Sequence, residues 1–323
     1  MLQLKDIVGL NIEASSICNG RCPFCSRNKK VRPYGSHILR HEDFLALPTV
    51  LFDHLEWISF GGNFGDLTTN PDMPAIARYI KSLNPEIALD GDTNGSVQDE
   101  SWWGELGPYF KNGVMCFSLD GLADTHAIHR KGTDFNRILR HIKAFTKSGG
   151  VAVWKFILFQ HNEHQIQEAQ KMAKEAGCTR FFVISSREYD EECRRPELID
   201  FDLKSDIFAS YASKALEEKG QAICKPYSNQ SIYLAADGTV HPCCLCHCMY
   251  ITEHDPRFEF VVPLIEQHLA KINFKSTPLE EILQGPYFEA VLNKSKTNSY
   301  CILKCNKYKK KVRKELILHD TFF

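Results

Sequence analysis

Three cysteines stand close together near the start of the chain: Cys18, Cys22 and Cys25. Three residues separate the first two and two residues separate the second and third, so one short loop carries three thiolates. Iron–sulfur clusters and structural zinc sites generally take four protein ligands, so three thiolates leave one metal position open to another molecule. The triplet therefore predicts a 4Fe-4S cluster with one free iron, and that open corner is where chemistry could take place.

A zinc site is the alternative for the same thiols, with His37 or His41 as its fourth ligand. Zinc sites more usually combine two cysteines that are two residues apart with a second such pair or with histidines. The spacing favours iron–sulfur, and the zinc alternative stays open at this point.

Two adjacent glycines, Gly61 and Gly62, follow an apolar run that is typical of a strand. Glycines at the end of a strand let the backbone approach a ligand closely and expose its carbonyl groups. The pair therefore predicts a turn that can touch a bound molecule.

The elements that must position these residues alternate between strand and helix up to about residue 220. Short apolar runs predict six strands, at 7–13, 56–60, 86–89, 114–119, 153–159 and 180–184. Apolar residues at helical spacing predict helices at 41–54, 73–83, 101–110, 135–146, 164–176 and 203–218. The alternation predicts a parallel sheet covered by helices, either open and doubly wound or closed into a complete or partial barrel.

The pattern changes after about residue 220, where a cysteine-rich segment begins. Residues 231–240 predict two short strands joined by a tight turn at 236–238, and helical patterns return at 279–283 and 287–292. We therefore expect two domains, at 1–220 and 221–323.

The composition is that of an ordinary globular protein, with 323 residues, 43% hydrophobic and 24% charged. The net charge of −1 argues against a general polyanion binder. No apolar stretch is long enough to span a bilayer, and the N-terminus lacks the basic and apolar regions of a signal peptide. The thirteen cysteines therefore indicate reduced thiols in a cytoplasmic protein, gathered where metals need them.

Motifs further along the chain, taken in order with the cysteine triplet, resemble those of the radical S-adenosylmethionine (AdoMet) superfamily and its SPASM/twitch subgroup. The matching runs are Asp92-Thr93-Asn94-Gly95, Ser118-Leu119-Asp120-Gly121 and, after His126, Arg130-Lys131-Gly132. Phe24, just before the third cysteine, and the glycine pair also fit, whereas Asn63 stands where the superfamily has glutamate. The resemblance covers about residues 6 to 305.

The resemblance implies an α/β fold, namely a partial (β/α)6 TIM-like barrel with a small C-terminal, cysteine-rich twitch/SPASM-like domain. It implies that the free iron chelates S-adenosyl-L-methionine and that one electron cleaves this cofactor to a 5'-deoxyadenosyl radical. It places the cofactor against Phe24, Gly61, Gly62, Asn94, Ser118, Asp120 and Arg130.

These cofactor residues suit such roles chemically. Ser118 can donate to the ribose or to the methionyl carboxylate, Arg130 can donate to that carboxylate, and Asp120 can accept from hydroxyls. The plainer alternatives are that Asn94 and Asp120 are turn residues before glycines, and that Arg130 only pairs with Asp134.

A second group of cysteines lies in the C-terminal part. Cys224 is followed by thirteen residues, Gly238, four residues and Cys243, and Cys301 and Cys305 come later. This arrangement resembles a shortened SPASM domain, which implies one auxiliary 4Fe-4S cluster with these four cysteines as ligands. The crowded segment in between leaves other ligands or a structural zinc knot open, through Cys244, Cys246, His247 or Cys248.

The leading hypothesis is a radical SAM oxidoreductase or modifying enzyme that abstracts hydrogen from a peptide or protein, with the auxiliary cluster assisting redox. The runner-up substrate is a small polar metabolite such as an amino sugar, because no peptide-recognition segment precedes the first strand. A reductant such as flavodoxin or ferredoxin is expected, and no membrane partner. No catalytic acid or base stands out among four polar residues that follow strands: Asp66, His126, Glu188 and Asp190.

The competing hypothesis from another class is a non-catalytic zinc or iron–sulfur protein that binds nucleic acid. Its contacts would come from a late basic run near the C-terminus and from a group of early basic residues, Arg21, Arg27, Lys29, Lys30 and Arg32. This hypothesis predicts neither the glycine pair nor the Ser-Leu-Asp-Gly run, so nucleic acid is the less favoured partner.

Overall fold

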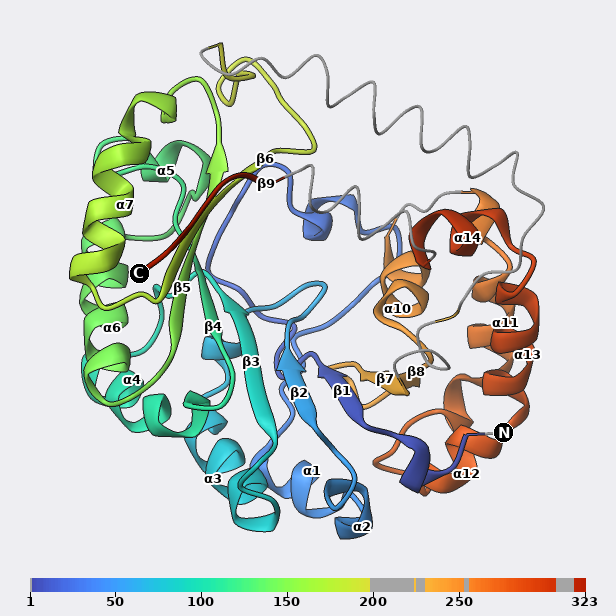
Figure 1. Ribbon diagram of the computed structural model, residues 1–323. Helices are drawn as coiled ribbons and strands as arrows, with labels where there is room; N and C mark the ends of the chain where they lie inside the picture. The colour runs from blue at the N-terminus through green and yellow to red at the C-terminus, as the bar shows by residue number, and fades with distance from the viewer. Residues whose placement is uncertain (1, 198–223, 225–229, 253–255, 306–316) are drawn as a thin grey trace.

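A curved nine-stranded sheet organises the computed structural model, which describes residues 2–197, 224, 230–252, 256–305 and 317–323 (Figure 1). The strand order is β8-β7-β1-β2-β3-β4-β5-β6-β9. Six strands form the parallel barrel: β1 Gly9–Ile12, β2 Trp57–Phe60, β3 Ala88–Thr93, β4 Met115–Ser118, β5 Ala152–Leu158 and β6 Arg180–Ser185. The sheet curves but does not close, which confirms the predicted partial barrel.

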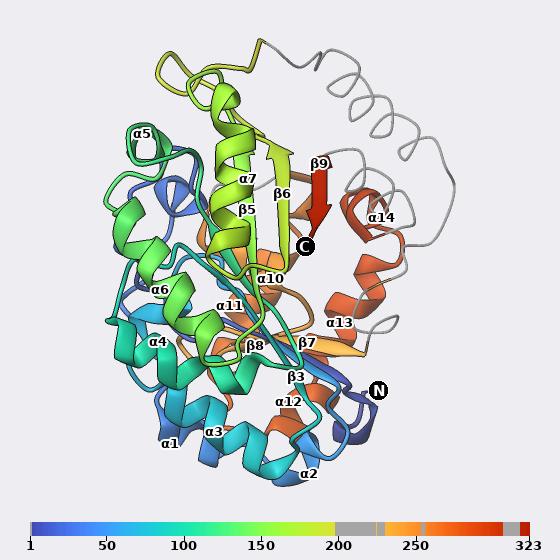
Figure 2. The ribbon, with the colours of Figure 1, turned by 60° about the vertical axis from the view of Figure 1, so that its left-hand side comes forward.

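Helices cover the outer face of the parallel strands (Figures 1 and 2). They are α1 His41–Leu45, α2 Thr49–Phe52, α3 Met73–Leu83, α4 Glu100–Leu106, α5 His126–His129, α6 Phe135–Lys147 and α7 Ile166–Glu175. The ring of Phe117 on β4 packs against Trp103 of α4 and Phe145 of α6, at centroid distances of 5.1 and 5.8 Å. Because side chains alternate along a strand, the neighbours Cys116 and Ser118 face the inside of the barrel.

Two of the predicted helices are each divided into two shorter elements in the structure. The helix predicted at 41–54 is split into α1 and α2 by Pro48, whose ring and missing N–H end one helix and begin another. The helix predicted at 101–110 is α4 followed by a 3-10 turn, Gly107–Phe110, with Pro108 at its start. The helix predicted at 203–218 lies outside the described residues.

The third strand is also longer than predicted. The sequence indicates 86–89, whereas β3 runs from Ala88 to Thr93. Asp90 and Asp92 interrupt the apolar run, and polar residues fit this strand because its inner face lines the barrel and not the helix layer.

The C-terminal part extends the same sheet at both edges. The predicted hairpin is confirmed as β7 Ser231–Leu234 and β8 Val240–His241, and Gly238 has the positive φ of 90° that its turn requires. The structure adds that β7 pairs in parallel with β1, and that β9 Ile317–Phe322 pairs antiparallel with β6. The last strand was not predicted.

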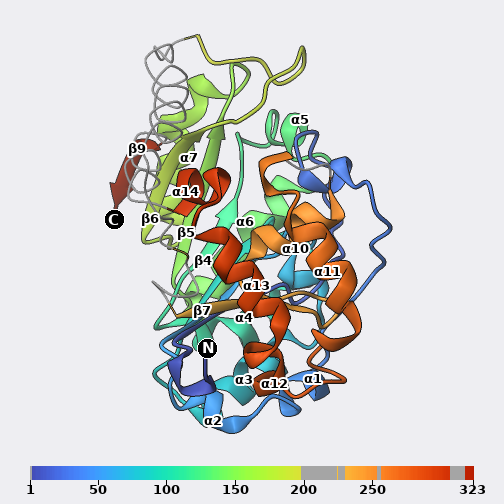
Figure 3. The same cartoon turned by 90° about the vertical axis from the view of Figure 1, so that its right-hand side faces the viewer.

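A group of helices packs beside this hairpin (Figure 3). It consists of α10 Cys244–Ile251, α11 Val261–His268, α12 Leu279–Gln284, α13 Pro286–Ser295 and α14 Ser299–Cys305. The helices predicted at 279–283 and 287–292 are confirmed as α12 and α13. Among the described residues, no helix combines the length and the apolar character needed to span a membrane.

Candidate functional site

The cysteine triplet lies on the loop that follows β1, at the carboxyl edge of the parallel strands. A Cβ placed on Gly20 would lie 3.5 Å from Cys18 Sγ and 3.8 Å from Cys22 Sγ, so both sulfur atoms approach the same part of the loop. Arg27 Nε donates to Cys25 Sγ at 3.5 Å, and Arg27 Nη1 donates to the carbonyl oxygen of Cys18 at 3.0 Å. The arginine therefore ties the third cysteine to the first.

The protonation of these thiols bears on cluster assembly. Burial raises the pKa of Cys18 to about 11 and also raises the pKa of Cys22, so both are protonated thiols at neutral pH without metal. Arg27 acts in the opposite direction on Cys18, and Arg130 does so on Cys22. Since only thiolates bind metal, assembly of a cluster must release these protons, and the two guanidinium groups offset the resulting negative charge.

A group of buried charged side chains lies next to the cysteine loop. Asp120 Oδ2 lies 2.7 Å from His129 Nδ1 and accepts from Arg130 Nε at 2.5 Å. Asp120 Oδ1 accepts from the backbone N–H of Ile157 at 2.7 Å. Arg130 also contacts the thiol of Cys22. Both oxygens of Asp120 thus hold protein groups and orient Arg130, and its expected contact with cofactor hydroxyls stays a prediction.

Phe24 lies against this cluster, since its ring stacks on His129 with a centroid distance of 5.9 Å. His129 was not singled out from the sequence, although it directly precedes Arg130. Arg130 pairs with Asp120 and not with Asp134, whose carboxylate caps α6 by accepting from the backbone N–H of Arg137.

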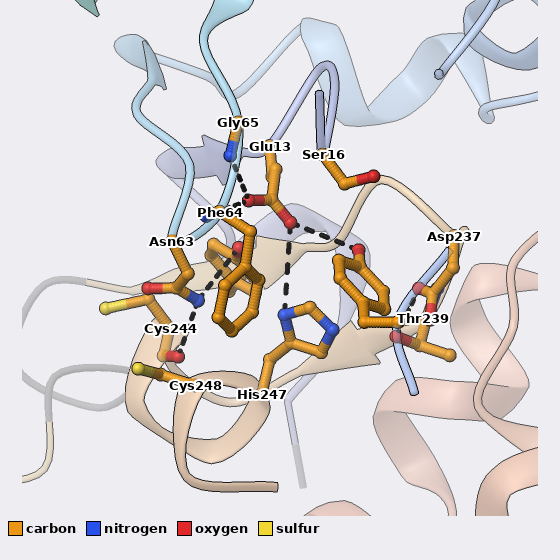
Figure 4. A network of polar contacts seen from close by, with 12 residues as sticks. Glu13, Ser16, Asn63, Phe64, Gly65, Asp237, Thr239, Cys244, His247 and Cys248 are labelled. Atoms are coloured by element: carbon orange, nitrogen blue, oxygen red, sulfur yellow. Dashed lines mark hydrogen bonds and ion pairs between the residues drawn. The ribbon is translucent and has the colours of Figure 1, made fainter. Parts of the chain in front are cut away.

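Glu13, a buried residue directly after β1, holds the turn that follows the glycine pair (Figure 4). Glu13 Oε1 accepts from the backbone N–H groups of Phe64 and Gly65 at 2.6 and 3.3 Å. Tyr34 donates its hydroxyl to Glu13 Oε2 at 3.2 Å. A Cβ on Gly62 would come within 2.7 Å of the Glu13 carboxylate, so a larger residue does not fit there. Sequence reasoning missed Glu13, which it treated as the end of a strand.

Asn63 points toward the start of α10 (Figure 4). Its Nδ2 group donates to the hydroxyl of Tyr233 and to the carbonyl oxygen of Cys244, both at 3.0 Å. A glutamate, the usual residue of the superfamily at this place, cannot donate these hydrogen bonds. The departure of this chain from the family pattern is therefore explained by a contact with the cysteine-rich helix.

Asn63→Asp should destabilise the protein by about 1–3 kcal/mol. The carboxylate keeps the size of the side chain but places an acceptor oxygen against the carbonyl oxygen of Cys244, which is itself an acceptor. Urea unfolding of the metal-free protein measures the change. Asn112→Asp is the matched control, since the amide of exposed Asn112 makes only a long 3.4 Å contact with the carbonyl of Pro85. Equal losses in the two variants would contradict the assigned role of Asn63.

Asn94 reaches the cysteine loop from the end of β3. Its Nδ2 lies 3.5 Å from Cys18 Sγ and 3.1 Å from the side-chain oxygen of Asn19. The backbone N–H of Asn94 donates to Asp66 Oδ2 at 2.6 Å, and Thr93 donates to Asp66 Oδ1 at 2.8 Å. Buried Asp66 therefore positions this loop, which argues against its use as a catalytic base.

The other candidate acids and bases are also engaged in the structure. His126 accepts from the backbone N–H of Asp120 through Nδ1, and burial lowers the pKa of His126 to about 4. Glu188 pairs with Lys29 at 2.6 Å. Asp190 accepts from two backbone N–H groups of its own loop.

The inner face of the barrel carries a polar group that the sequence did not reveal. Lys155 of β5 donates to Asp92 Oδ1 of β3 at 2.8 Å, across the intervening strand β4. Cys116 of β4 contacts both of these residues, and burial raises its pKa to about 12. Ser118 lies on the same face, in register with Lys155. Asp92 Oδ2 is also 3.8 Å from the position of a Cβ on Gly61, so this polar group adjoins the glycine pair.

The cysteines of the C-terminal part gather around Cys301, which is buried. Burial raises the pKa of Cys301, and the further contributions come from the nearby thiols of Cys243, Cys305 and Cys224. The four residues expected to form the second metal site therefore lie close together. Cys246 is an additional neighbour, since its Sγ is 3.7 Å from Cys243 Sγ.

The thiol positions bear on the choice between zinc and iron–sulfur. A zinc ion needs all its ligands at about 2.0–2.3 Å from one point, whereas each iron of a cube takes its own thiolate. In the part of the chain that the structure describes, no three His, Cys, Asp or Glu side chains converge closely enough to hold a single ion. His41, offered as a zinc ligand, packs on Tyr79 of α3. The donors gathered at both places are thiols, which are the ligands of iron–sulfur clusters.

The open parallel barrel with three cysteines after its first strand is the arrangement of a known class. Residues 12–183 match the family model of the Radical SAM superfamily, so the chain belongs to this superfamily. Residues 224–306 match the model of the SPASM iron-sulfur cluster-binding domain. The cofactors of the protein are therefore a 4Fe-4S cluster and S-adenosyl-L-methionine, together with auxiliary iron–sulfur clusters in the C-terminal part.

Solved structures with the same fold include Streptococcus suis SuiB bound to the precursor peptide SuiA, with 14% identity and a TM-score of 0.56. That match covers 88% of this chain and 66% of SuiB. Native anSMEcpe with bound AdoMet and Cp18Cys peptide is 19% identical, with a TM-score of 0.56 over 94% of this chain and 85% of that one. At these identities the similarity shows the fold alone. Among curated proteins, none matches with significant similarity.

Proposed function

We propose that this protein cleaves AdoMet reductively and abstracts a hydrogen atom from a peptide or protein. The observation that carries the proposal is the proximity of Cys18 and Cys22, with Cys25 beside Cys22, in one loop flanked by Asn94 and by the buried Arg130. In this proposal Cys18, Cys22 and Cys25 hold the cluster. When bound, the cluster and AdoMet supply a 5'-deoxyadenosyl radical.

The residues around the loop would divide the work of binding AdoMet. Gly61 and Gly62 offer backbone groups, and Ser118 and Arg130 offer donors for hydroxyl and carboxylate groups. Phe24 supplies an apolar surface next to His129. Asp120 acts indirectly, since it fixes the guanidinium of Arg130.

The auxiliary cluster is assigned to Cys224, Cys243, Cys301 and Cys305, within a C-terminal domain at 221–323 that follows a barrel domain at 1–220. Four thiolates close a cluster, which suits electron transfer better than binding of a substrate. Bound to these four thiolates, the cluster would supply a centre for accepting or relaying one electron.

The choice of a peptide substrate is supported by the two similar structures that hold peptides. The ion pair of Asp92 and Lys155 favours a second candidate, a small polar metabolite such as an amino sugar, because it offers both a carboxylate and an ammonium group inside the barrel.

Transfer of deuterium from the substrate to 5'-deoxyadenosine distinguishes the two candidate substrate classes. The anaerobically reconstituted protein is incubated with dithionite, AdoMet and either the peptide fraction or the small-molecule fraction of fully deuterated cells. We expect 5'-deoxyadenosine one mass unit heavier with the peptide fraction. A heavier product only with the small-molecule fraction would support the metabolite, and no 5'-deoxyadenosine in any mixture would refute the radical chemistry.

A further inference from the structure

The last strand of the barrel, β6, carries an added strand from a distant part of the chain. β9 lies antiparallel beside it, with Phe322 opposite Arg180 and Ile317 opposite Ile184 (Figures 1 and 2). In the part of the chain that the structure describes, β9 ends the sheet on this side. A segment of the protein itself therefore sits, as an extended peptide, on the edge of the barrel.

Main-chain hydrogen bonds join β9 to β6. The N–H of Phe323 donates to the carbonyl oxygen of Thr179 at 3.0 Å. Alternate residues of an antiparallel strand point their N–H groups to the same neighbour, so the N–H of Thr321, opposite Phe181, also faces β6. By the same alternation, the N–H of Asp320 faces away from β6. These hydrogen bonds do not depend on side chains, so another extended peptide can make them equally well.

The side chains at the end of β9 pack loosely. Phe322 is 70% exposed and Phe323 is 40% exposed. The guanidinium of Arg180 lies over the ring of Phe322, 4.8 Å from its centroid, and Thr321 accepts from Gln170 Nε2 at 3.2 Å. Because two large apolar rings stay partly or mostly in contact with solvent, an incoming strand that replaces this end of β9 gives up little apolar burial.

A strand in this position directs alternate side chains into the barrel. Phe181 of β6 belongs to the buried core, so its neighbour Phe182 faces the other way, on the same side as Lys155. Residues directly opposite each other on paired strands share one face, so a residue opposite Phe182 also faces the inside. Phe182 is in register with Lys155, and Lys155 with Ser118. The edge of β6 therefore leads to the polar group inside the barrel.

We propose that the edge of β6 is the docking site of the peptide substrate, and that β9 occupies this site until a substrate strand replaces it. The inference rests on the proposed function and deepens it, because it gives the peptide an extended conformation antiparallel to β6. In this orientation the N-terminal part of the docked segment lies at the carboxyl end of β6, at the edge that carries the cysteine loop. The residue that loses a hydrogen atom then lies at or before the N-terminal end of that segment.

The test measures peptide binding to the full-length chain by fluorescence anisotropy, with and without reconstituted clusters. The probe is a labelled synthetic peptide with the sequence of residues 317–323. In wild type the probe should bind weakly, because β9 competes for the same edge from within the chain. Thr321→Pro removes an N–H that faces β6 and should strengthen binding of the probe about tenfold. Asp320→Pro is the matched control, since it adds the same ring where the N–H faces away, and should bind as wild type does.

Backbone methylation of the probe shows whether it binds as a strand. A probe N-methylated at the positions of Thr321 and Phe323 loses two donors toward β6 and should bind Thr321→Pro at least about tenfold more weakly than the unmodified probe. The isomer methylated at the positions of Asp320 and Phe322 should bind as the unmodified probe does. Equal losses for the two isomers, or no binding to any form of the protein, would overturn the docking site.

A competition measurement links this edge to the substrate. In the reconstituted protein, the unlabelled probe should lower deuterium transfer from the deuterated peptide fraction in step with its binding. Unchanged transfer at a saturating probe concentration would overturn the docking site and leave the proposed function standing. Dimers of Thr321→Pro in light scattering, in place of probe binding, would assign the edge to a second copy of the chain and also overturn the proposal. No 5'-deoxyadenosine in any mixture would refute the proposed function and with it the assignment of a substrate.

Discussion

Cys22→Ala should lower the formation of 5'-deoxyadenosine at least about a thousandfold, well beyond the 10–100-fold typical for residues that only support a metal ligand. The reason is that two thiolates cannot hold a cube that needs three, so the site for AdoMet is lost together with the metal. Iron content should fall by about four atoms per chain. The measurements are mass spectrometry of the product and iron analysis of the same anaerobic preparation.

Cys178→Ala is the matched control for this prediction. Cys178 is also a buried thiol, but it lies between α7 and β6, away from both groups of cysteines. It should keep the iron content and the rate of wild type. Full iron content and full cleavage in Cys22→Ala would contradict the assignment of the triplet as the cluster loop.

Asp120→Asn should remove about 3–5 kcal/mol of unfolding free energy, the usual cost of leaving one partner of a buried ion pair uncompensated. Asp120 is completely buried, and its carboxylate is shared by His129 and Arg130. An amide oxygen cannot balance the charge of Arg130, which should then move away from the Cys22 thiol. We therefore also expect weaker binding of AdoMet, measured by equilibrium dialysis, alongside the lower stability in urea.

The pH dependence gives this prediction a second measurement. Burial acts to raise the pKa of Asp120, but Arg130 and the hydrogen bonds of His129 and Ile157 prevail and hold it well below its usual value. A lowered native pKa means that the stabilisation is complete above the ordinary aspartate pKa of about 3.9 and is lost progressively as the pH falls below it. The difference between wild type and Asp120→Asn should therefore shrink on acidification below about pH 4.

Asp134→Asn is the control for Asp120→Asn. Asp134 caps α6, and asparagine caps a helix about as well as aspartate, so the change should be within about 0.5 kcal/mol. Similar losses of stability in the two variants would show that the ion pair of Asp120 and Arg130 contributes no more than an ordinary helix cap.

The fold could be predicted from the sequence to the level of the six parallel strands of the barrel. Apolar runs such as those of β1, β2 and β4 have the length and the spacing of buried strands, and the following helices have a clear apolar face. The boundaries were less certain where one face of a strand is polar, as in β3, or where a proline divides a helical pattern, as at Pro48. The pairing of β7 with β1 joins residues more than 200 positions apart, and no local pattern encodes it.

The residues of the candidate site likewise fall into those that local motifs predict and those that only the structure reveals. The cysteine triplet, the glycine pair and the Ser118–Arg130 segment are local motifs, because the chemistry needs several groups on one loop or strand end. Glu13 and the pair of Asp92 and Lys155 have no such pattern, since each acts through a partner on another strand.

The sequence by itself determined which residue types are present for metal and cofactor chemistry, and on which strand ends they lie. Only the tertiary structure decided which of them face each other. It placed Asp120 against Arg130, and it directed Asn63 to the cysteine-rich helix. The physical reason is that spacing along the chain fixes which groups share a loop, whereas contacts between strands depend on sheet register and curvature, which the whole core determines.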